Sequence, residues 1–140
     1  RFLDLFAGAG GVGLEALSRG AAHATFVERD GQAIAALREN VKALDVAALV
    51  SVRRGDVLRE LPGLLASGER FDIVFLDPPY DAGLVETTLE MLGGGGLMLP
   101  DALVIAQHFT KRGPAPIIGR LGSFRTRRFG ETTLTFYRAG

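Results

Sequence analysis

The sequence predicts an α/β protein in which helices cover both faces of a largely parallel sheet. Short apolar segments alternate with helical segments four times, and an antiparallel pair follows. The 140 residues, 47% of them hydrophobic, are enough to bury the core of one domain. No linker or internal repeat interrupts them, so we expect residues 1–140 to form a single domain.

Short apolar runs predict the strands of the first half, at residues 2–6, 24–27, 49–52 and 71–76. Between the first two strands we expect a helix at residues 12–19, which Gly20 closes in a left-handed conformation. Asp30 is a suitable N-cap for the next helix. One apolar stripe along that helix consists of Ile34, Leu37, Val41 and Leu44.

The second half predicts a helix at residues 84–92 and a fifth strand at 103–106. The run of four glycines at 93–96 predicts a loop between them. Segments 124–128 and 132–137 predict an antiparallel pair that turns at residues 129–131. Sheets of this kind bind ligands at the carboxyl ends of their strands. Side chains that follow the predicted strands are therefore the candidates for a site.

Composition excludes several kinds of site. The chain has no cysteine, which excludes disulfides and thiolate zinc sites, and its two histidines are far apart, so we expect no metal. No apolar run reaches the length of a membrane span, and we expect a cytoplasmic protein. The net charge is zero, but residues 1–101 carry −6 and residues 102–140 carry +6. This asymmetry indicates either a polyanionic partner or a solvated strand surface.

A glycine-rich loop follows the first strand. Gly8-Ala9-Gly10-Gly11-Val12-Gly13 matches G-x-G-x-x-G, a pattern that lets the backbone approach a ligand closely. Glu28, at the end of the second strand, is placed to accept hydrogen bonds from ribose hydroxyls. Nicotinamide dinucleotide enzymes share both features, so the two alone do not identify the ligand.

Two further acids favour one cofactor. Asp4 lies inside the first strand, where a cationic ligand would compensate its burial and a pyrophosphate would be repelled. Asp56 ends the third strand, where it can accept a hydrogen bond from the adenine amine. S-adenosylmethionine offers ribose, adenine, an ammonium and a sulfonium without phosphate, and we predict it as the cofactor. A nicotinamide dinucleotide is the alternative, and both acids could also be ordinary caps.

The fourth strand ends in Asp77-Pro78-Pro79-Tyr80. An exocyclic amine of a nucleobase is a weak nucleophile, and an enzyme can assist it by accepting both of its N–H bonds. The Asp77 carboxylate and the Pro78 carbonyl could accept them, and the prolines keep that carbonyl out of any ladder. Tyr80 could stack on the unstacked base. The alternative is a rigid turn in which Tyr80 packs on the core.

Several segments resemble class I S-adenosylmethionine-dependent methyltransferases that act on amino groups. They are DLFAGAGGVGLEALSRGA (4–21), FVERD (26–30), GD (55–56) and FDIVFLDPPY (71–80). Phe6 stands where the commoner motif has its first glycine. The segments GLEALSRGA and RRFGETTLTFYR (127–138) narrow the resemblance to bacterial RsmD-type enzymes, which methylate guanine N2 in 16S ribosomal RNA.

The resemblance implies a Rossmann-like seven-stranded sheet whose last strand is antiparallel. It implies that Asp4, Gly8 and Gly10 lie beside the methionine moiety, with Glu28 at the ribose and Asp56 at the adenine amine. The target guanine is implied to lie at Asp77, Pro78, Pro79 and Tyr80. The other implied cofactor-binding residues are Phe6, Ala7, Arg29, Val57 and Asp77.

The function implied is methyl transfer from S-adenosylmethionine to the N2 amine of a guanine in small-subunit ribosomal RNA, by a monomer. Arg125, Arg127 and Arg128 are candidate RNA contacts. Alternatives are adenine N6 or cytosine N4 of DNA, a protein glutamine amide, a nucleotide-dependent oxidoreductase and a non-catalytic RNA-binding module. The absence of a target-recognition domain argues against sequence-specific DNA methylation.

The sequence departs from the family pattern in two places. Family members usually carry a segment before the first strand that helps to close over cofactor and RNA, and it is absent here. The end of the fifth strand usually carries an acid, where this sequence has Gln107-His108. We expect His108 on the surface or in a loop rather than in contact with the base.

Overall fold

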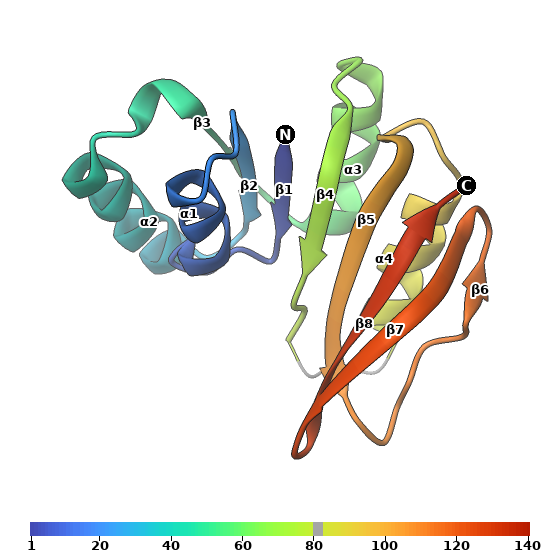
Figure 1. The fold of residues 1–140 in the computed structure, drawn as a ribbon. Helices are drawn as coiled ribbons and strands as arrows, with labels where there is room; N and C mark the ends of the chain where they lie inside the picture. Colours follow the sequence, from blue (N-terminus) through green and yellow to red (C-terminus); the bar gives the residue numbers. More distant parts are fainter. Residues whose placement is uncertain (80–82) are drawn as a thin grey trace.

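The computed structural model describes residues 1–79 and 83–140, and the strands within them form one sheet (Figure 1). Its strand order is β3-β2-β1-β4-β5-β8-β7-β6. The parallel strands are β1 (Phe2–Leu5), β2 (Ala24–Glu28), β3 (Val50–Arg54), β4 (Phe71–Leu76) and β5 (Met98–Phe109). The antiparallel ones are β6 (Ile117–Ile118), β7 (Leu121–Phe129) and β8 (Thr132–Ala139). The predicted mostly parallel sheet with an antiparallel end is confirmed.

The sheet has eight strands in the described residues instead of the expected seven. The extra strand, β6, is only two residues long and pairs with β7 at the edge of the sheet. β5 is also longer than the predicted 103–106, because its pairing with β8 continues to Phe109. The predicted turn at residues 129–131 joins β7 to β8, with Gly130 at a φ of 64°.

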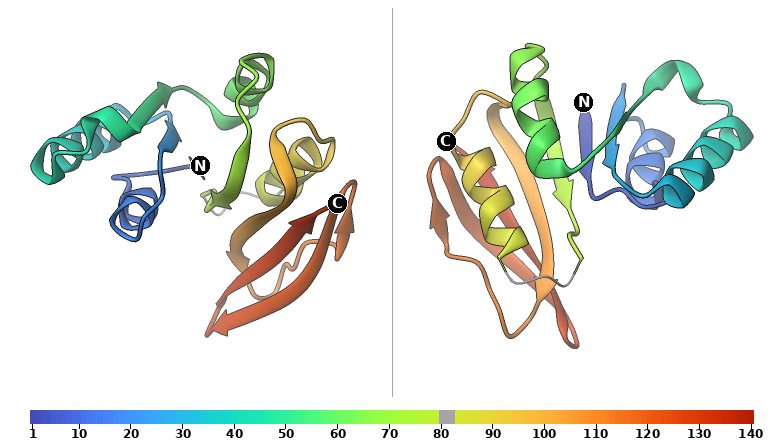
Figure 2. Two further views of the ribbon diagram at one scale, coloured as in Figure 1. Left: turned by 45° about the horizontal axis from the view of Figure 1, so that its top comes forward. Right: turned by 180° about the vertical axis from the view of Figure 1, so that it is seen from behind.

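Helices cover both faces of the sheet, as predicted (Figure 2). The four α-helices are α1 (Gly11–Ser18), α2 (Gly31–Leu44), α3 (Val57–Ala66) and α4 (Leu84–Gly93), and a 3₁₀ turn η1 spans Ala47–Leu49. Side chains of α1 and α2 share one apolar cluster with Phe2, Phe26 and Phe75. Side chains of α3 and α4 share the other cluster with Leu3, Val74 and Tyr137. Neighbouring residues of one strand therefore point to different clusters.

α3 and the end of α2 differ from what the sequence predicts. The sequence reading missed α3, because Pro62 interrupts its helical signal, although Asp56 caps it and Val57, Leu61 and Leu64 are buried along one side. In α2, Asp30 is the N-cap as predicted, and its carboxylate accepts from the Ala33 N–H. Leu44, however, is 57% exposed and does not belong to the buried stripe, because the helix ends at that residue.

The parallel strands β1, β4 and β5 end at the same edge of the sheet, which lies at the bottom of Figure 1. On one face of the sheet, α1 and α2 cover β1 and β2. On the same face, no described helix lies in front of β5, β8 and β7. Viewed from behind, α4 lies over these same strands. One half of the sheet is thus covered on a single face in the part of the chain that the structure describes.

Candidate active site

The deepest carboxylate of the site belongs to Asp4, in the central strand β1. Asp4 is 1% exposed, and its Oδ2 accepts a hydrogen bond of 3.0 Å from the Gly13 N–H in the first turn of α1. A Cβ at Gly13 would lie 2.7 Å from Cζ of Phe26 in β2 and 3.2 Å from that same Oδ2. Glycine is required here so that α1 can approach the sheet closely enough to bind the acid. Sequence reasoning predicted that Asp4 needs a partner but did not identify Gly13.

The pKa of Asp4 is raised to about 7, chiefly by burial; the hydrogen bond from the Gly13 N–H lowers it, and the charges of Asp77 and Glu28 raise it. Three acids on three adjacent strands thus face a common edge of the sheet. Their mutual repulsion is relieved when a cation binds nearby. The electrostatics of this edge suit a cationic ligand and oppose a pyrophosphate.

We predict that this raised pKa makes the stability of the ligand-free protein fall with rising pH. The folded protein keeps the Asp4 proton up to about pH 7, whereas an unfolded carboxyl loses it near 3.8, so this contribution is present below about pH 4 and is lost by about pH 7. The slope attributable to Asp4 reaches at most about 1.4 kcal/mol for each pH unit.

Chemical denaturation of wild type and Asp4→Asn between pH 4 and 8 measures this slope. An asparagine oxygen can still accept from the Gly13 N–H, so the variant isolates the proton. The expected result is that the unfolding free energy of Asp4→Asn rises relative to wild type as the pH increases. Parallel curves for the two proteins would contradict the assignment.

The loop after β1 has an unusual backbone. Phe6 has a φ of 62°, in the left-handed region that glycine adopts without cost and other residues adopt at about 1–3 kcal/mol. Phe6 stands where the commoner motif has a glycine, a residue that adopts this conformation without cost. Gly8 and Gly10 follow with φ values of 58° and 86°, and a Cβ at Gly8 would meet nothing within 4 Å. The loop is therefore open at Gly8, whereas a Cβ at Gly10 would overlap the Leu37 side chain.

Glu28, at the end of β2, binds this loop. Its Oε1 accepts from the Gly8 N–H at 2.8 Å, and its Oε2 accepts from the N–H groups of Arg29 and Asp30 at 3.0 and 2.9 Å. A carboxylate offers about four acceptor positions, so these donors leave roughly one on Oε1. That position could accept from a ribose hydroxyl. Ala7 is also fixed to β2, because its N–H donates to the Val27 carbonyl.

Asp56 and Val57 begin α3 next to the end of β3. The Asp56 Oδ1 accepts from the Leu58 N–H at 3.2 Å, which makes Asp56 the N-cap. The Val57 side chain is 3% exposed in the core, so a ligand could reach only its backbone N–H, which is unpaired within the first helical turn. The Gly55 N–H donates to the Glu28 carbonyl, which holds the ends of β2 and β3 together.

Asp77, Pro78 and Pro79 follow β4. Asp77 is half-buried, and burial raises the pKa of its carboxyl. Phe75 packs with the α1 and α2 cluster, so strand alternation directs Asp77 to the same face as Asp4. Neither proline has an N–H, so neither can join a ladder. The fourth residue predicted for this turn, Tyr80, lies outside the described residues.

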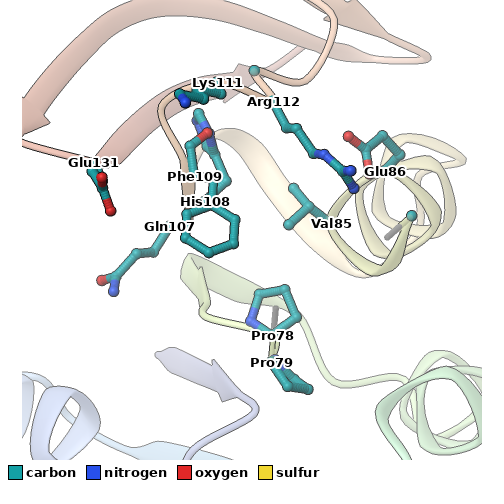
Figure 3. Close-up of a pocket in the computed structure, with 12 residues that line it drawn as sticks. Pro78, Pro79, Val85, Glu86, Gln107, His108, Phe109, Lys111, Arg112 and Glu131 are labelled. Carbon is teal, nitrogen blue, oxygen red and sulfur yellow. The ribbon is translucent and has the colours of Figure 1, made fainter. Parts of the chain in front are cut away.

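A cavity of about 740 Å³ adjoins the two prolines. Figure 3 shows them opposite His108 and Phe109, with Lys111 and Arg112 on the far side and Val85 and Glu86 on α4. None of the predicted cofactor-binding residues is among the described residues that line the cavity. The sequence reading did not predict this cavity, because it is built from residues of four separate segments.

His108 is buried in β5. Only 5% of it is exposed, so the prediction that it lies on the surface or in a loop is wrong. Its Nδ1 lies 2.7 Å from the Phe109 carbonyl, which can only accept, so Nδ1 carries a proton. Its Nε2 lies 2.7 Å from the Thr135 hydroxyl in β8. Both ring nitrogens are therefore used within the protein, and the imidazole ties β5 to β8 beside the cavity.

The three candidate RNA-contacting arginines lie on β7 and are all exposed. Arg125 and Arg127 pair in register with Phe136 and Leu134, whereas Arg128 pairs with Thr133 and donates from Nε to the Gly130 carbonyl at 2.9 Å. Successive residues of a strand point to opposite faces, so Arg128 lies on the other face of the hairpin.

The described residues contain no cluster of three or more metal-ligating side chains. No described helix is long and apolar enough to cross a membrane. The site fits S-adenosylmethionine chemically, because the open glycine loop lies among the carboxylates of Asp4, Glu28 and Asp77. Ribose hydroxyls and the adenine amine donate hydrogen bonds, and a carboxylate accepts them.

Comparison with known proteins shows the family. The family model described as conserved hypothetical protein 95 matches residues 1–138. A candidate rRNA methyltransferase of Bacillus subtilis (strain 168), YlbH, is 35% identical, over 99% of this chain and 75% of that protein. Ribosomal RNA small subunit methyltransferase D of Escherichia coli (strain K12) is 32% identical, over 96% of this chain and 66% of that protein.

The fold is shared with solved structures. A conserved hypothetical protein of Streptococcus pyogenes superposes with a TM-score of 0.92 at 31% identity, over 100% of this chain and 86% of the other. Two solved methyltransferases that are 14% and 20% identical also share the fold, with TM-scores of 0.80 and 0.69. The predicted Rossmann-like class I methyltransferase fold is therefore confirmed.

Proposed function

This chain belongs to the conserved hypothetical protein 95 family, and from that membership and its site we propose that it methylates a guanine of small-subunit ribosomal RNA at N2. The methyl group would come from S-adenosylmethionine. The observation that carries the proposal is the Asp77-Pro78 turn, which ends β4 beside the glycine loop and the acids of β1 and β2. The name of the Escherichia coli relative supports the choice of small-subunit RNA.

The residues of the first three strands would hold the cofactor, which supplies a methyl group on a sulfonium when it is bound. Glu28 would accept from a ribose hydroxyl through the free position on Oε1, and the glycine loop would follow the methionine chain. Asp56 would accept from the adenine amine, and the Val57 N–H would donate to the adenine ring. Asp4 would stay beneath the loop and favour the positive charge electrostatically.

The residues after β4 would hold the acceptor. The Asp77 carboxylate and the Pro78 carbonyl would each accept one N–H of the guanine amine, which holds the nitrogen in line with the methyl group. Such alignment can contribute about 7–11 kcal/mol. The amine nitrogen would take the methyl group that the bound cofactor supplies, and the electron pair of the broken C–S bond would remain on sulfur. The amine then loses one proton, either to water or to Asp77, whose raised pKa makes it a better acceptor than an exposed aspartate.

The cavity beside Pro78 and Pro79 would receive the nucleotide that carries the target base. A base must leave its stack to reach such a site, and Tyr80 is the aromatic side chain we propose to stack on it. Lys111 and Arg112 at the cavity wall would pair with phosphate. We also propose that Arg125, Arg127 and Arg128 contact the RNA, and that the enzyme is a cytoplasmic monomer.

The residues of this site support the alternative functions less well than RNA methylation. A nicotinamide dinucleotide would bring its pyrophosphate toward Asp4, Glu28 and Asp77, and the charges of Glu28 and Asp77 already raise the pKa of Asp4. The Asp77-Pro78 turn would also have no role in hydride transfer. DNA and protein amide substrates share the amino-methylation chemistry, and the +6 charge of residues 102–140 favours a nucleic acid over a protein.

Nucleoside mass spectrometry tests the function directly. We would incubate the protein with S-adenosylmethionine and unmodified small ribosomal subunits, and digest the RNA to nucleosides. The expected result is N2-methylguanosine with the wild type and none with Asp77→Ala. Binding of S-adenosylhomocysteine without any methylated nucleoside would keep the cofactor assignment and reject ribosomal RNA as the substrate.

A further inference from the structure

We propose that the face of the β7–β8 hairpin opposite α4 binds the unpaired RNA that flanks the target nucleotide, by stacking bases on aromatic and guanidinium groups that are exposed or, at Phe136, half-buried. We call these residues the stacking surface: Phe124, Arg125, Arg127, Phe129, Phe136 and Arg138. The inference rests on the proposed function only in taking the ligand to be the RNA substrate.

Strand register assigns these side chains to one face. Arg127 pairs with Leu134, which packs against the same cluster as Ile105 on the face of Asp77. Arg125 pairs with Phe136 and therefore lies on this face too. An irregularity between Ser123 and Arg125 brings Phe124 to the same face, where its ring centroid lies 6.4 Å from that of Phe136.

The chemistry of the surface suits single-stranded nucleic acid. Phe124 is 52% and Phe129 is 58% exposed, so much of each aromatic ring remains in contact with solvent. The guanidinium carbons of Arg138, Arg127 and Arg125 lie 4.9, 5.6 and 5.8 Å from the ring centroids of Phe124, Phe129 and Phe136. Unpaired bases stack on both aromatic rings and guanidinium planes, and the positive charge attracts the phosphates.

The surface is continuous with the proposed acceptor site. Thr132, at the start of β8, pairs with Phe109 at the end of β5, so the tip of the hairpin lies at the edge of the sheet where β4 ends (Figure 1). Viewed from behind, α4 lies over the other face of these strands (Figure 2). An RNA strand that delivers its base to Asp77 can therefore continue along β8 and β7.

Charge favours RNA over a protein partner. Within residues 102–140 the one acidic side chain is Glu131, in the turn, against seven basic ones. An apolar protein segment, or the same hairpin face of a second copy, would bury Arg125, Arg127 and Arg138 without a supply of carboxylates, which is unfavourable. An RNA strand offers a phosphate for each guanidinium and a base for each ring.

The test uses an RNA oligonucleotide in which 2-aminopurine flanks the target guanine, because stacking quenches its fluorescence. We expect the wild type to quench it, and Phe129→Ala or Phe124→Ala to lose the quenching and to bind the RNA roughly tenfold more weakly. The dependence of affinity on salt should stay as in wild type for both variants, because no charge is removed.

Arg128→Ala is the matched control, because Arg128 lies on the same strand but on the opposite face. We expect it to reduce the salt dependence while quenching persists. Unchanged quenching in both phenylalanine variants would overturn the proposal, as would a phenylalanine-dependent dimer in sedimentation that excludes RNA. Quenching that depends on Phe124 and Phe129, with no N2-methylguanosine in small subunits, would keep this surface and reject the proposed methylation.

Discussion

Replacement of Asp77 by alanine is expected to lower kcat by about 10²- to 10⁴-fold while the affinity for S-adenosylhomocysteine stays within a few-fold. The carboxylate stands at the end of β4, half-buried, on the face of the glycine loop. It contributes to the acidic edge of the cofactor site but lies beyond the residues proposed for ribose and adenine. Its loss therefore affects the amine that it would hold much more than the cofactor.

Two comparison variants make this result specific. Asp72→Ala removes an exposed carboxylate from the same strand and should leave kcat nearly unchanged. Asp77→Asn keeps an oxygen that can accept from the amine but cannot take its proton. An Asp77→Asn enzyme close to wild type would mean that the residue only accepts a hydrogen bond. Wild-type turnover by Asp77→Ala would refute the proposed role altogether.

Gly13→Ala is expected to destabilise the protein by about 1–3 kcal/mol and to weaken S-adenosylhomocysteine binding by about tenfold or more. The added methyl group would overlap the Phe26 ring, against which α1 now lies directly. To avoid it, α1 would have to move away from β2, which breaks the hydrogen bond from the Gly13 N–H to Asp4. The buried acid would then lose its partner.

Gly11→Ala is the matched control for this helix. A Cβ at Gly11 would meet nothing within 4 Å, and alanine has a better helix propensity than glycine. We expect it to leave the unfolding free energy unchanged or to raise it by up to about 1 kcal/mol. Thermal and chemical unfolding of the two variants, with calorimetric binding of S-adenosylhomocysteine, would make the comparison. Equal stability of both variants would contradict the close-packing argument.

Much of the fold follows from local patterns in the sequence. Short apolar runs identified β1 to β4, and Asp30 and Gly20 marked helix ends correctly because caps and left-handed closures are local features. Local patterns failed where a residue's role depends on distant partners. His108 is buried with its Nε2 hydrogen-bonded to the hydroxyl of Thr135, a residue 27 positions later in the chain.

In the candidate site too, local features could be predicted from the sequence and contacts between distant residues could not. The acids after the strands could be predicted, because strand ends meet at one edge of a parallel sheet. The link from Asp4 to Gly13 could not, because it depends on how closely α1 approaches β2. The face of Phe124 also escaped prediction, because the irregularity at Ser123 breaks the simple alternation that would place Phe124 opposite Arg125.

The acidic and basic parts of the chain lie in different parts of the folded molecule. The acidic first hundred residues form β1 to β4 and the four helices, and the basic remainder forms most of β5 and the hairpin (Figure 1). The molecule therefore carries a large electric dipole across the width of its sheet despite its zero net charge. A polyanion approaching by diffusion is turned toward the hairpin before any contact forms, so productive collisions become more frequent at low ionic strength.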